Sequence, residues 1–121
     1  MPDPRTSREF KFTAGQSVYV VSNDFAVQRR AEEQFAKDGR FKVVNGLSGA
    51  DFVFMSIFDE SSSPAEEFAI VLLPDDYAQH RSDLDSLREH ALWRVSGTPH
   101  GFGSEVKRVV KKFEEQASVS R

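Results

Sequence analysis

The chain has 121 residues, a length that fits a single domain. Hydrophobic residues make up 39% of it and charged residues 29%, a balance typical of a globular protein and not of a disordered one. The sequence contains no cysteine, which excludes disulfides, cysteine nucleophiles and cysteine-ligated metal centres. The formal net charge of −3 argues against a general nucleic-acid binder. No apolar run is long enough for a transmembrane segment, and residues 1–15 lack the apolar stretch of a signal peptide.

The first half of the chain predicts a flexible lead-in over residues 1–16, which contains two prolines, followed by a strand over residues 17–22 (SVYVVS). A second short strand is expected at residues 41–44, followed by a loop over residues 45–49. Because a helix separates these two strands by short connections, we expect them to be parallel.

That helix is predicted to begin after a cap at Asn23 or Asp24, to extend to about Asp38 and to stop at Gly39. One face of it is apolar at helical spacing. The residues of this face are Val27, Ala31, Phe35 and Ala36.

Two apolar strands follow, over residues 51–58 (DFVFMSIF) and 67–73 (EFAIVLL). In the first of them Phe52, Phe54 and Phe58 point one way and Val53, Met55 and Ile57 the other. Both faces are therefore apolar, which predicts a central strand. Residues 59–65 are expected to form a loop, and residues 74–76 (Pro-Asp-Asp) a turn.

Residues 83–97 allow two interpretations. As a helix capped by Ser82 or Asp83, the segment has an apolar face of Leu84, Leu87, Ala91, Leu92 and Val95. As a strand, Ala91, Trp93 and Val95 alternate with Leu92, Arg94 and Ser96. The local pattern by itself favours the helix, and the choice decides the fold.

The last element predicted is a helix over residues 104–117 with Ser104 as its N-cap, followed by a tail of residues 118–121. Its apolar stripe is Val106, Val109, Val110, Phe113 and Ala117. Its opposite face carries Lys107, Arg108, Lys111 and Lys112. We interpret this basic face as solvated, although it has the charge to meet an anionic lipid or nucleic acid.

Few residues suggest chemistry. His80, His90 and His100 lie ten residues apart, a spacing that predicts scattered surface histidines better than a metal site. Asp75 and Asp76 could hold a cation or act as a carboxylate pair, but a strand ending in Pro-Asp-Asp is more typical of a turn.

The remaining polar clusters are weaker candidates for a functional site. The glycine-rich stretch at residues 97–104 could bind an anion before the last helix, but it lacks a phosphate-loop motif and is expected to be a connection. Residues 61–63 (Ser-Ser-Ser) lack the context of a serine nucleophile. The acidic pairs 59–60 and 66–67 are expected to be solvated, and Trp93 to pack in the core. We therefore expect no catalytic, cofactor-binding or metal-binding residue.

The order of phrases along the chain carries a resemblance. VYVVS precedes a helix and KDGRFKVVNGLSGADFVFMSI, after which come EFAIVLL, HALWRVSG and EVKRVVKKFEEQ. This order resembles small bacterial envelope α+β domains, related in architecture to the amino-terminal domain of the Tol–Pal translocation protein and to curli-secretion and penicillin-binding-protein-activator lipoproteins. The resemblance covers about residues 17–117, which we take as the single domain.

This resemblance implies a strand over residues 88–96, with residues 74–87 as the connection before it. The order would then be strand, helix, four strands and helix, in a mixed sheet with two helices packed on it. The resemblance also implies a periplasmic or envelope protein that acts through interactions and has no active site. The absence of a signal peptide and the long charged connection depart from this pattern.

A second resemblance competes. ADFVFMSIF with FAIVLLPDDY is similar to a strand pair of TIR-like nucleotide-binding domains, which have a flavodoxin-like α/β fold. That fold would place Asp24, Asp75 and Asp76 at the carboxyl ends of parallel strands, where such folds bind ligands. The Asn-x-x-x-Glu-Leu-Gly motif that bears the catalytic glutamate of TIR-like domains is missing. A nucleotide-binding module or hydrolase is therefore the alternative function.

The helices and strands also predict how the domain is used. Two helices can cover one face of a five-stranded sheet, or one helix can cover part of each face. In either arrangement apolar sheet surface should remain for a partner or a second copy. We therefore expect a non-enzymatic protein-interaction domain of a bacterial envelope protein, able to self-associate, without cofactor or nucleic acid.

Overall fold

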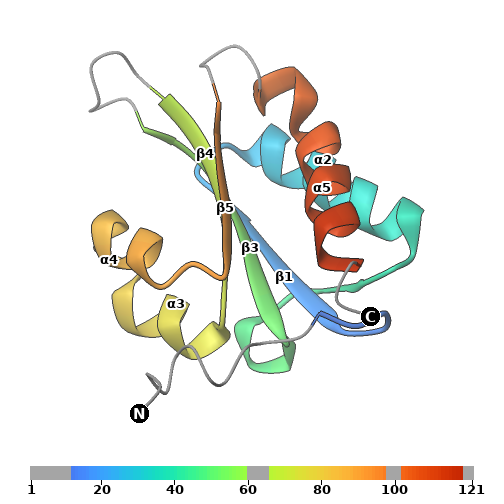
Figure 1. The fold of residues 1–121 in the computed structure, drawn as a ribbon, viewed down its shortest axis with the longest axis horizontal. Helices are drawn as coiled ribbons and strands as arrows, with labels where there is room; N and C mark the ends of the chain where they lie inside the picture. The colour runs from blue at the N-terminus through green and yellow to red at the C-terminus, as the bar shows by residue number, and fades with distance from the viewer. Residues whose placement is uncertain (1–11, 60–65, 98–101, 119–121) are drawn as a thin grey trace.

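The computed structural model describes residues 12–59, 66–97 and 102–118. They form a five-stranded mixed sheet with helices on both faces, which confirms the α+β class (Figure 1). In chain order the elements are β1 (Ser17–Ser22), α2 (Phe25–Asp38), β2 (Lys42–Val44), the 3₁₀ helix η1 (Leu47–Gly49), β3 (Phe52–Asp59), β4 (Glu66–Leu72), α3 (Pro74–His80), α4 (Leu84–Glu89), β5 (Trp93–Gly97) and α5 (Phe102–Ser118).

The strands lie in the order β2-β1-β3-β4-β5. β1 is parallel to β2 and to β3, as expected for β1 and β2, and β3 is central, as its two apolar faces predicted. β4 is antiparallel to both β3 and β5. The flavodoxin-like alternative is therefore wrong. Because β4 runs opposite to β1, Asp24 after β1 and Asp75 after β4 lie at opposite ends of the sheet.

Local signals set the bounds of α2. The Asp24 carboxylate accepts hydrogen bonds from the N–H groups of Ala26 and Val27, at 2.9 and 3.2 Å. Gly39 ends the helix with a φ of 68°, a left-handed conformation that glycine adopts without steric cost. The predicted apolar face is correct except at Ala36, which is exposed. Gln34 is buried in its place, because position 34 follows position 27 by two helical turns and position 36 points away.

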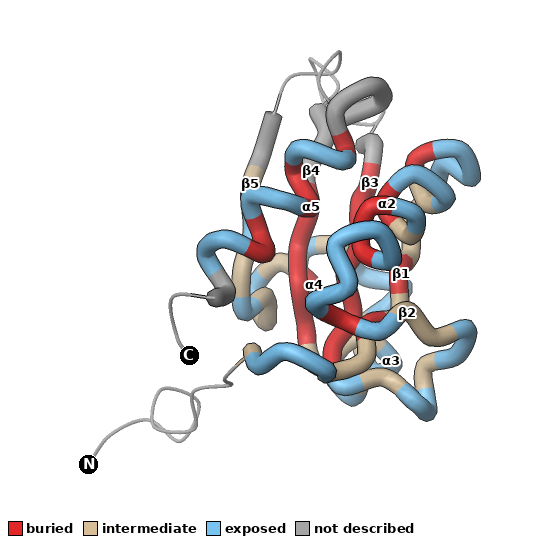
Figure 2. The backbone as a smooth tube through the Cα atoms, turned by 90° about the vertical axis from the view of Figure 1, so that its right-hand side faces the viewer, coloured by how far each residue is buried: buried red, intermediate tan, exposed pale blue. Residues whose placement is uncertain are grey.

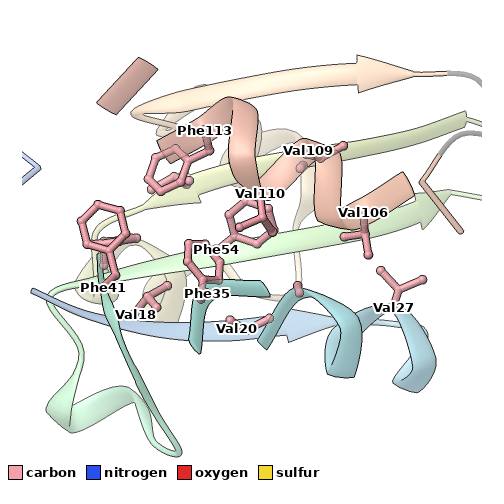
Figure 3. Close-up of a cluster of buried hydrophobic side chains, with 14 residues drawn as sticks. Val18, Val20, Val27, Phe35, Phe41, Phe54, Val106, Val109, Val110 and Phe113 are labelled. Atoms are coloured by element: carbon pink, nitrogen blue, oxygen red, sulfur yellow. The ribbon is translucent and has the colours of Figure 1, made fainter. Parts of the chain in front are cut away.

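One face of the sheet packs against α2 and α5 through a cluster that we call the aromatic core (Figure 3). Phe35 from α2, Phe54 from β3 and Phe113 from α5 meet at its centre, with ring centroids 5.2 to 6.3 Å apart. Phe12, from the segment expected to be a lead-in, packs edge-to-face on Phe113 at 5.1 Å. The buried residues of the aromatic core are Val18, Val20, Val27, Ala31, Phe35, Phe41, Phe52, Phe54, Ala69, Val71, Val106, Val109, Val110 and Phe113.

The opposite face packs against α3 and α4 through a smaller cluster, the minor core. Its buried residues are Met55, Ile57, Ile70, Leu72 and Leu87. Within β3, Phe52 and Phe54 belong to the aromatic core and Met55 and Ile57 to the minor core, so these four residues divide between the two faces as the strand pattern predicted. Figure 2 shows the buried stretches of β3 and β4 in the middle of the molecule, between the helices.

The minor core corrects the expectation of a leftover apolar face. Two short helices that the sequence did not settle cover this face, so the chain buries it by itself. Among the described residues, the exposed large hydrophobic side chains are Phe25 and Leu92, 72% and 39% exposed. This face therefore gives no reason for self-association, which stays a prediction.

Both interpretations of residues 83–97 are correct for part of the segment. A helix capped by Asp83 covers Leu84–Glu89, and a strand covers Trp93–Gly97. The helix does not extend through Val95, and the strand does not begin at Arg88, because pairing with β4 from Trp93 onwards sets where the strand begins. The expected turn at residues 74–76 is also wrong, since Pro74 begins α3, a position where proline loses no hydrogen bond.

α5 begins at Phe102, two residues before the predicted cap at Ser104. The serine and Gly103 before it therefore lie inside the first turn of the helix.

Candidate functional site

The connection between β4 and β5 gathers three potential metal ligands. Asp76 and His80 lie four residues apart on α3 and so share one face of that helix. His90 caps the C-terminal end of α4. One ligand atom from each of the three residues lies within 4.8 Å of the other two. We call this group the Asp-His-His cluster.

The two imidazole rings are in direct contact. The rings of His80 and His90 stack with centroids 4.4 Å apart and planes 20° from parallel. Both histidines and Asp76 are half-buried, so the cluster is accessible from solvent while its side chains are partly supported by their neighbours.

Hydrogen bonds at the ends of α4 hold the second histidine in place. Nδ1 of His90 lies 2.7 Å from the carbonyl oxygen of Ser86. When Nδ1–H donates to this carbonyl, the lone pair of Nε2 remains for another partner. Second-sphere carbonyls orient metal-binding histidines in this way. The hydrogen bond of His90 to Ser86 is therefore compatible with a role of His90 as a metal ligand.

The start of α4 is tied to the end of α3. The backbone N–H of Asp83 donates to the carbonyl of His80 at 2.9 Å. The Asp83 carboxylate accepts from the N–H of Asp85, and from the N–H and hydroxyl of Ser86, at 3.0 to 3.3 Å. The pKa of Asp83 is lowered chiefly by the hydrogen bonds from Ser86. The nearby His80 lowers it to a lesser degree. These hydrogen bonds therefore form a corner that joins the end of α3 to the start of α4.

The sequence pattern did not reveal that these three residues combine. Asp76 is next to Asp75 in the chain and suggested a carboxylate pair, but Asp75 is exposed and outside the cluster. His80 and His90 suggested a regular spacing with His100, which lies outside the described residues. The signal that could have revealed the cluster is the Asp76-x-x-x-His80 spacing, which places two ligands on one helical face. The expected turn at residues 74–76 hid that signal.

The other candidates have structural roles or lie outside the described residues. Asp24 caps α2. Residues 60–63 and 98–101, with the serine run and most of the glycine-rich stretch, lie outside the described part. Asp59 ends β3, and Glu66 and Glu67 begin β4.

Trp93 packs where the sequence predicted. Its ring stacks on Phe54, with centroids 6.5 Å apart, and lies 5.2 Å from Phe113. Its indole N–H donates to the side-chain oxygen of Gln116. Trp93 therefore joins β5 to α5.

The basic face of α5 is exposed, as expected for a solvated face. It consists of Lys107, Arg108, Lys111 and Lys112. Lys107 lies 4.0 Å from Glu33 of α2 in an ion pair whose side chains are about half exposed.

A second feature that sequence analysis missed is a pair of acids between α2 and α5. Glu114 is 4% exposed, and its carboxyl group shares a hydrogen bond with Asp38. Burial, reinforced by Asp38, raises the pKa of Glu114 to about 8, while Arg40 and Lys111 oppose this rise. The bond from Glu114 lowers the pKa of Asp38. At neutral pH Glu114 is therefore protonated, and its carboxyl O–H donates a hydrogen bond to the Asp38 carboxylate.

The outer edge of the sheet at β5 is the other surface of interest. β5 pairs only with β4 among the described strands. Trp93 and Val95 face the aromatic core yet are only half-buried, because no strand within the described residues lies beyond them. Between them Arg94 points to the opposite face and is exposed. The β2 edge at the other end is shorter and carries the exposed Lys42.

Comparisons with known proteins show a similar fold in one solved structure. No protein-family model matches the chain, and no curated protein matches its sequence. Among solved structures, the chain is similar to TolB from Acinetobacter baumannii, with a TM-score of 0.54 and 13% identity over 88% of this chain. The match covers 29% of TolB, so the chain spans less than a third of that protein. The similarity shows a common fold and agrees, at that level, with the resemblance to Tol–Pal envelope proteins. Within the described ranges, no helix is long and apolar enough to cross a membrane.

Proposed function

We propose that this chain is a non-enzymatic protein-interaction domain of a bacterial envelope protein, and that it binds a partner at the outer edge of β5. The observation that carries the proposal is the outer edge of the five-residue strand β5, which no other described strand pairs with, and its incompletely buried apolar side chains. The fold similarity to a part of TolB supports the envelope setting.

An open strand edge offers unpaired backbone N–H and C=O groups, which a second extended segment can satisfy by adding one strand to the sheet. At β5 such a strand would also complete the burial of Trp93 and Val95. Each of these side chains already packs against the aromatic core from one side. The edge therefore offers an added strand both backbone hydrogen bonds and contact with the apolar side chains of Trp93 and Val95.

The chemistry of this edge defines the partner. Residues of the added strand on the α5 side should be apolar, since they would contact Trp93 and Val95. On the other face, Arg94 favours an acidic residue directly opposite. The proposed partner is thus an extended protein segment that alternates apolar and acidic residues. The arms of the test distinguish a different protein from a second copy of this chain.

Site-specific photo-crosslinking in cells of the source organism tests this proposal. A photoreactive amino acid replaces Arg94 on the β5 edge and, as a matched control, Lys42 on the β2 edge. Both are exposed basic residues of terminal strands. We expect a discrete protein adduct from position 94 in the envelope fraction and a weaker one or none from position 42. Mass spectrometry identifies whether the adduct holds another protein or a second copy.

Arg94→Glu provides the complementary arm, since an acidic residue opposite an acidic partner should weaken the complex. Lys42→Glu makes the same charge change at the other edge and should leave the complex intact. Equal adducts from both positions, or none from position 94 in any fraction, would show that the β5 edge is not the binding surface.

A further inference from the structure

We propose that the Asp-His-His cluster binds a divalent transition metal, with Zn²⁺ as the reference ion, through Asp76, His80 and His90. This inference is independent of the proposed binding at β5, because the cluster lies on the α3–α4 connection and uses none of the residues of that edge.

The ligand types select the class of metal. Two imidazole nitrogens and one carboxylate oxygen suit Zn²⁺, Cu²⁺, Ni²⁺ and Fe²⁺, whereas Mg²⁺ and Ca²⁺ prefer oxygen ligands throughout. A surface acidic cluster would not discriminate in this way. The cluster contains a single carboxylate beside two stacked imidazoles, so nitrogen ligands dominate it.

The geometry is close to that of a bound metal. With metal–ligand bonds of about 2.1 Å, the ligand atoms of a tetrahedral site lie roughly 3.4 Å apart. The ligand atoms of the cluster lie within 4.8 Å of one another, so binding requires each pair to converge by at most about 1.4 Å. Side-chain rotation of half-buried residues can supply such a movement, and the hydrogen bond between Asp83 and His80 already joins the two helices that carry them.

The orientation of His90 provides a second, independent support. Its Nδ1 is occupied by the carbonyl of Ser86, so Nε2 is the nitrogen left to bind a metal. Three protein ligands on a half-buried surface leave a fourth coordination position that faces solvent. A water molecule or one side chain of a partner protein can occupy that position.

Metal binding would have a mechanical consequence. Asp76 and His80 belong to α3 and His90 to the end of α4, so one ion would link both helices that cover the minor core. Ligands that bind only the folded state raise its stability by mass action. We therefore expect the ion to raise the melting temperature and to slow amide exchange in α3 and α4 more than in α2 and α5.

Isothermal titration calorimetry on the full-length chain without an affinity tag tests the site. At about pH 7.5, we expect one Zn²⁺ per chain with a Kd of roughly 10 µM or below. Asp76→Asn, His80→Gln and His90→Gln should each weaken binding by about tenfold or more. Asp75→Asn changes the adjacent, exposed carboxylate and should leave the affinity unchanged. MgCl₂ in place of ZnCl₂ should give no heat of binding.

Two measurements on the unmodified chain keep the test valid even if a variant fails to fold. Co²⁺ should give the visible absorption bands of a low-coordinate nitrogen and oxygen site. NMR correlations of the imidazole nitrogens should show Nε2 of His90 shifting on addition of Zn²⁺. A Kd weaker than about 1 mM, or equal losses in Asp75→Asn and Asp76→Asn, would overturn the assignment. So would Zn²⁺-dependent shifts confined to His100.

Discussion

The two helical layers of this domain differ in almost every physical respect. α2 and α5, with 14 and 17 residues, pack long apolar stripes onto the aromatic core. α3 and α4, with 7 and 6 residues, bury mainly Leu87 and cover the minor core. The comparison separates two tasks, because the first layer holds the fold together while the second carries the polar cluster.

The difference has a thermodynamic reason. Helices of six or seven residues are not stable in isolation and depend on caps and on the few apolar contacts they make. Segments with few buried contacts open locally at lower free energy than the rest of a domain. We therefore expect the α3–α4 layer to be the less stable one, and a bound metal ion would compensate for this.

The largest expected effect contrasts the two cores. Phe113→Ala should lower the free energy of unfolding by about 4 kcal/mol, because the ring contacts six other aromatic residues of the aromatic core and its loss leaves a large cavity. Leu87→Ala in the minor core should cost about 2–3 kcal/mol. Urea denaturation followed by circular dichroism measures both values. If Leu87→Ala lowered the free energy of unfolding more than Phe113→Ala, the α3–α4 layer and not the α2–α5 layer would be the main source of stability.

The next effect is a pH dependence that only the α2–α5 layer should show. Glu114 keeps its proton in the folded state up to about pH 8, whereas in the unfolded state it loses this proton near pH 4.5. The folded state thus binds more protons between these values, so stability is lost as the pH rises through this range. Asp38 has a lowered pKa and acts in the opposite sense, but only near and below its ordinary value of 3.8.

We expect the free energy of unfolding to fall by about 2–3 kcal/mol from pH 5 to pH 8.5, because each pKa unit corresponds to about 1.4 kcal/mol and solvent beside the exposed Asp38 reduces the total. Glu114→Gln should abolish most of this slope, which denaturant titrations at several pH values would show. Glu115→Gln alters the adjacent, exposed carboxylate and should keep the slope. A slope that persists in Glu114→Gln would assign it to other groups.

A smaller effect compares the caps of the two layers. Asp24→Ala removes two hydrogen bonds to the first turn of α2 and should lower the global stability by about 1 kcal/mol. Asp83→Ala removes the equivalent cap of α4 and should appear as faster amide exchange at residues 84–89, because this short helix can open without unfolding the sheet. Hydrogen exchange by NMR distinguishes the two. Equal acceleration throughout the chain in Asp83→Ala would contradict a separable α3–α4 layer.

The smallest effect concerns the ion pair between the two long helices. Lys107→Ala should change the free energy of unfolding by less than about 0.5 kcal/mol, because Lys107 and Glu33 are 4.0 Å apart and both about half exposed. Thermal unfolding at low and high salt measures it. A loss above 1 kcal/mol, roughly the upper limit for exposed pairs, would show that this contact stabilises the layer more than its geometry indicates.

The sequence by itself determined the elements that are specified by local signals, namely helix caps and the spacing of apolar residues. The alternation of apolar residues from Phe52 to Ile57 predicted a strand with two buried faces, and Asp24 and Gly39 predicted both ends of α2. In each case the information is local, since caps and side-chain periodicity depend on residues a few positions apart. The antiparallel pair that completes the sheet came only from the resemblance to envelope domains.

The tertiary structure alone decided the second layer and its cluster. Residues 83–97 fit both a helix and a strand, and only the partner strand β4 settles that pairing starts at Trp93. His80 and His90 are ten residues apart in the chain and in contact in space, because α3 and α4 fold back on each other through the Asp83 corner. The raised pKa of Glu114 likewise depends on its burial and on Asp38, which lies far from it in the sequence. Contacts between distant segments carry no local signature, and that is why the sequence could not show them.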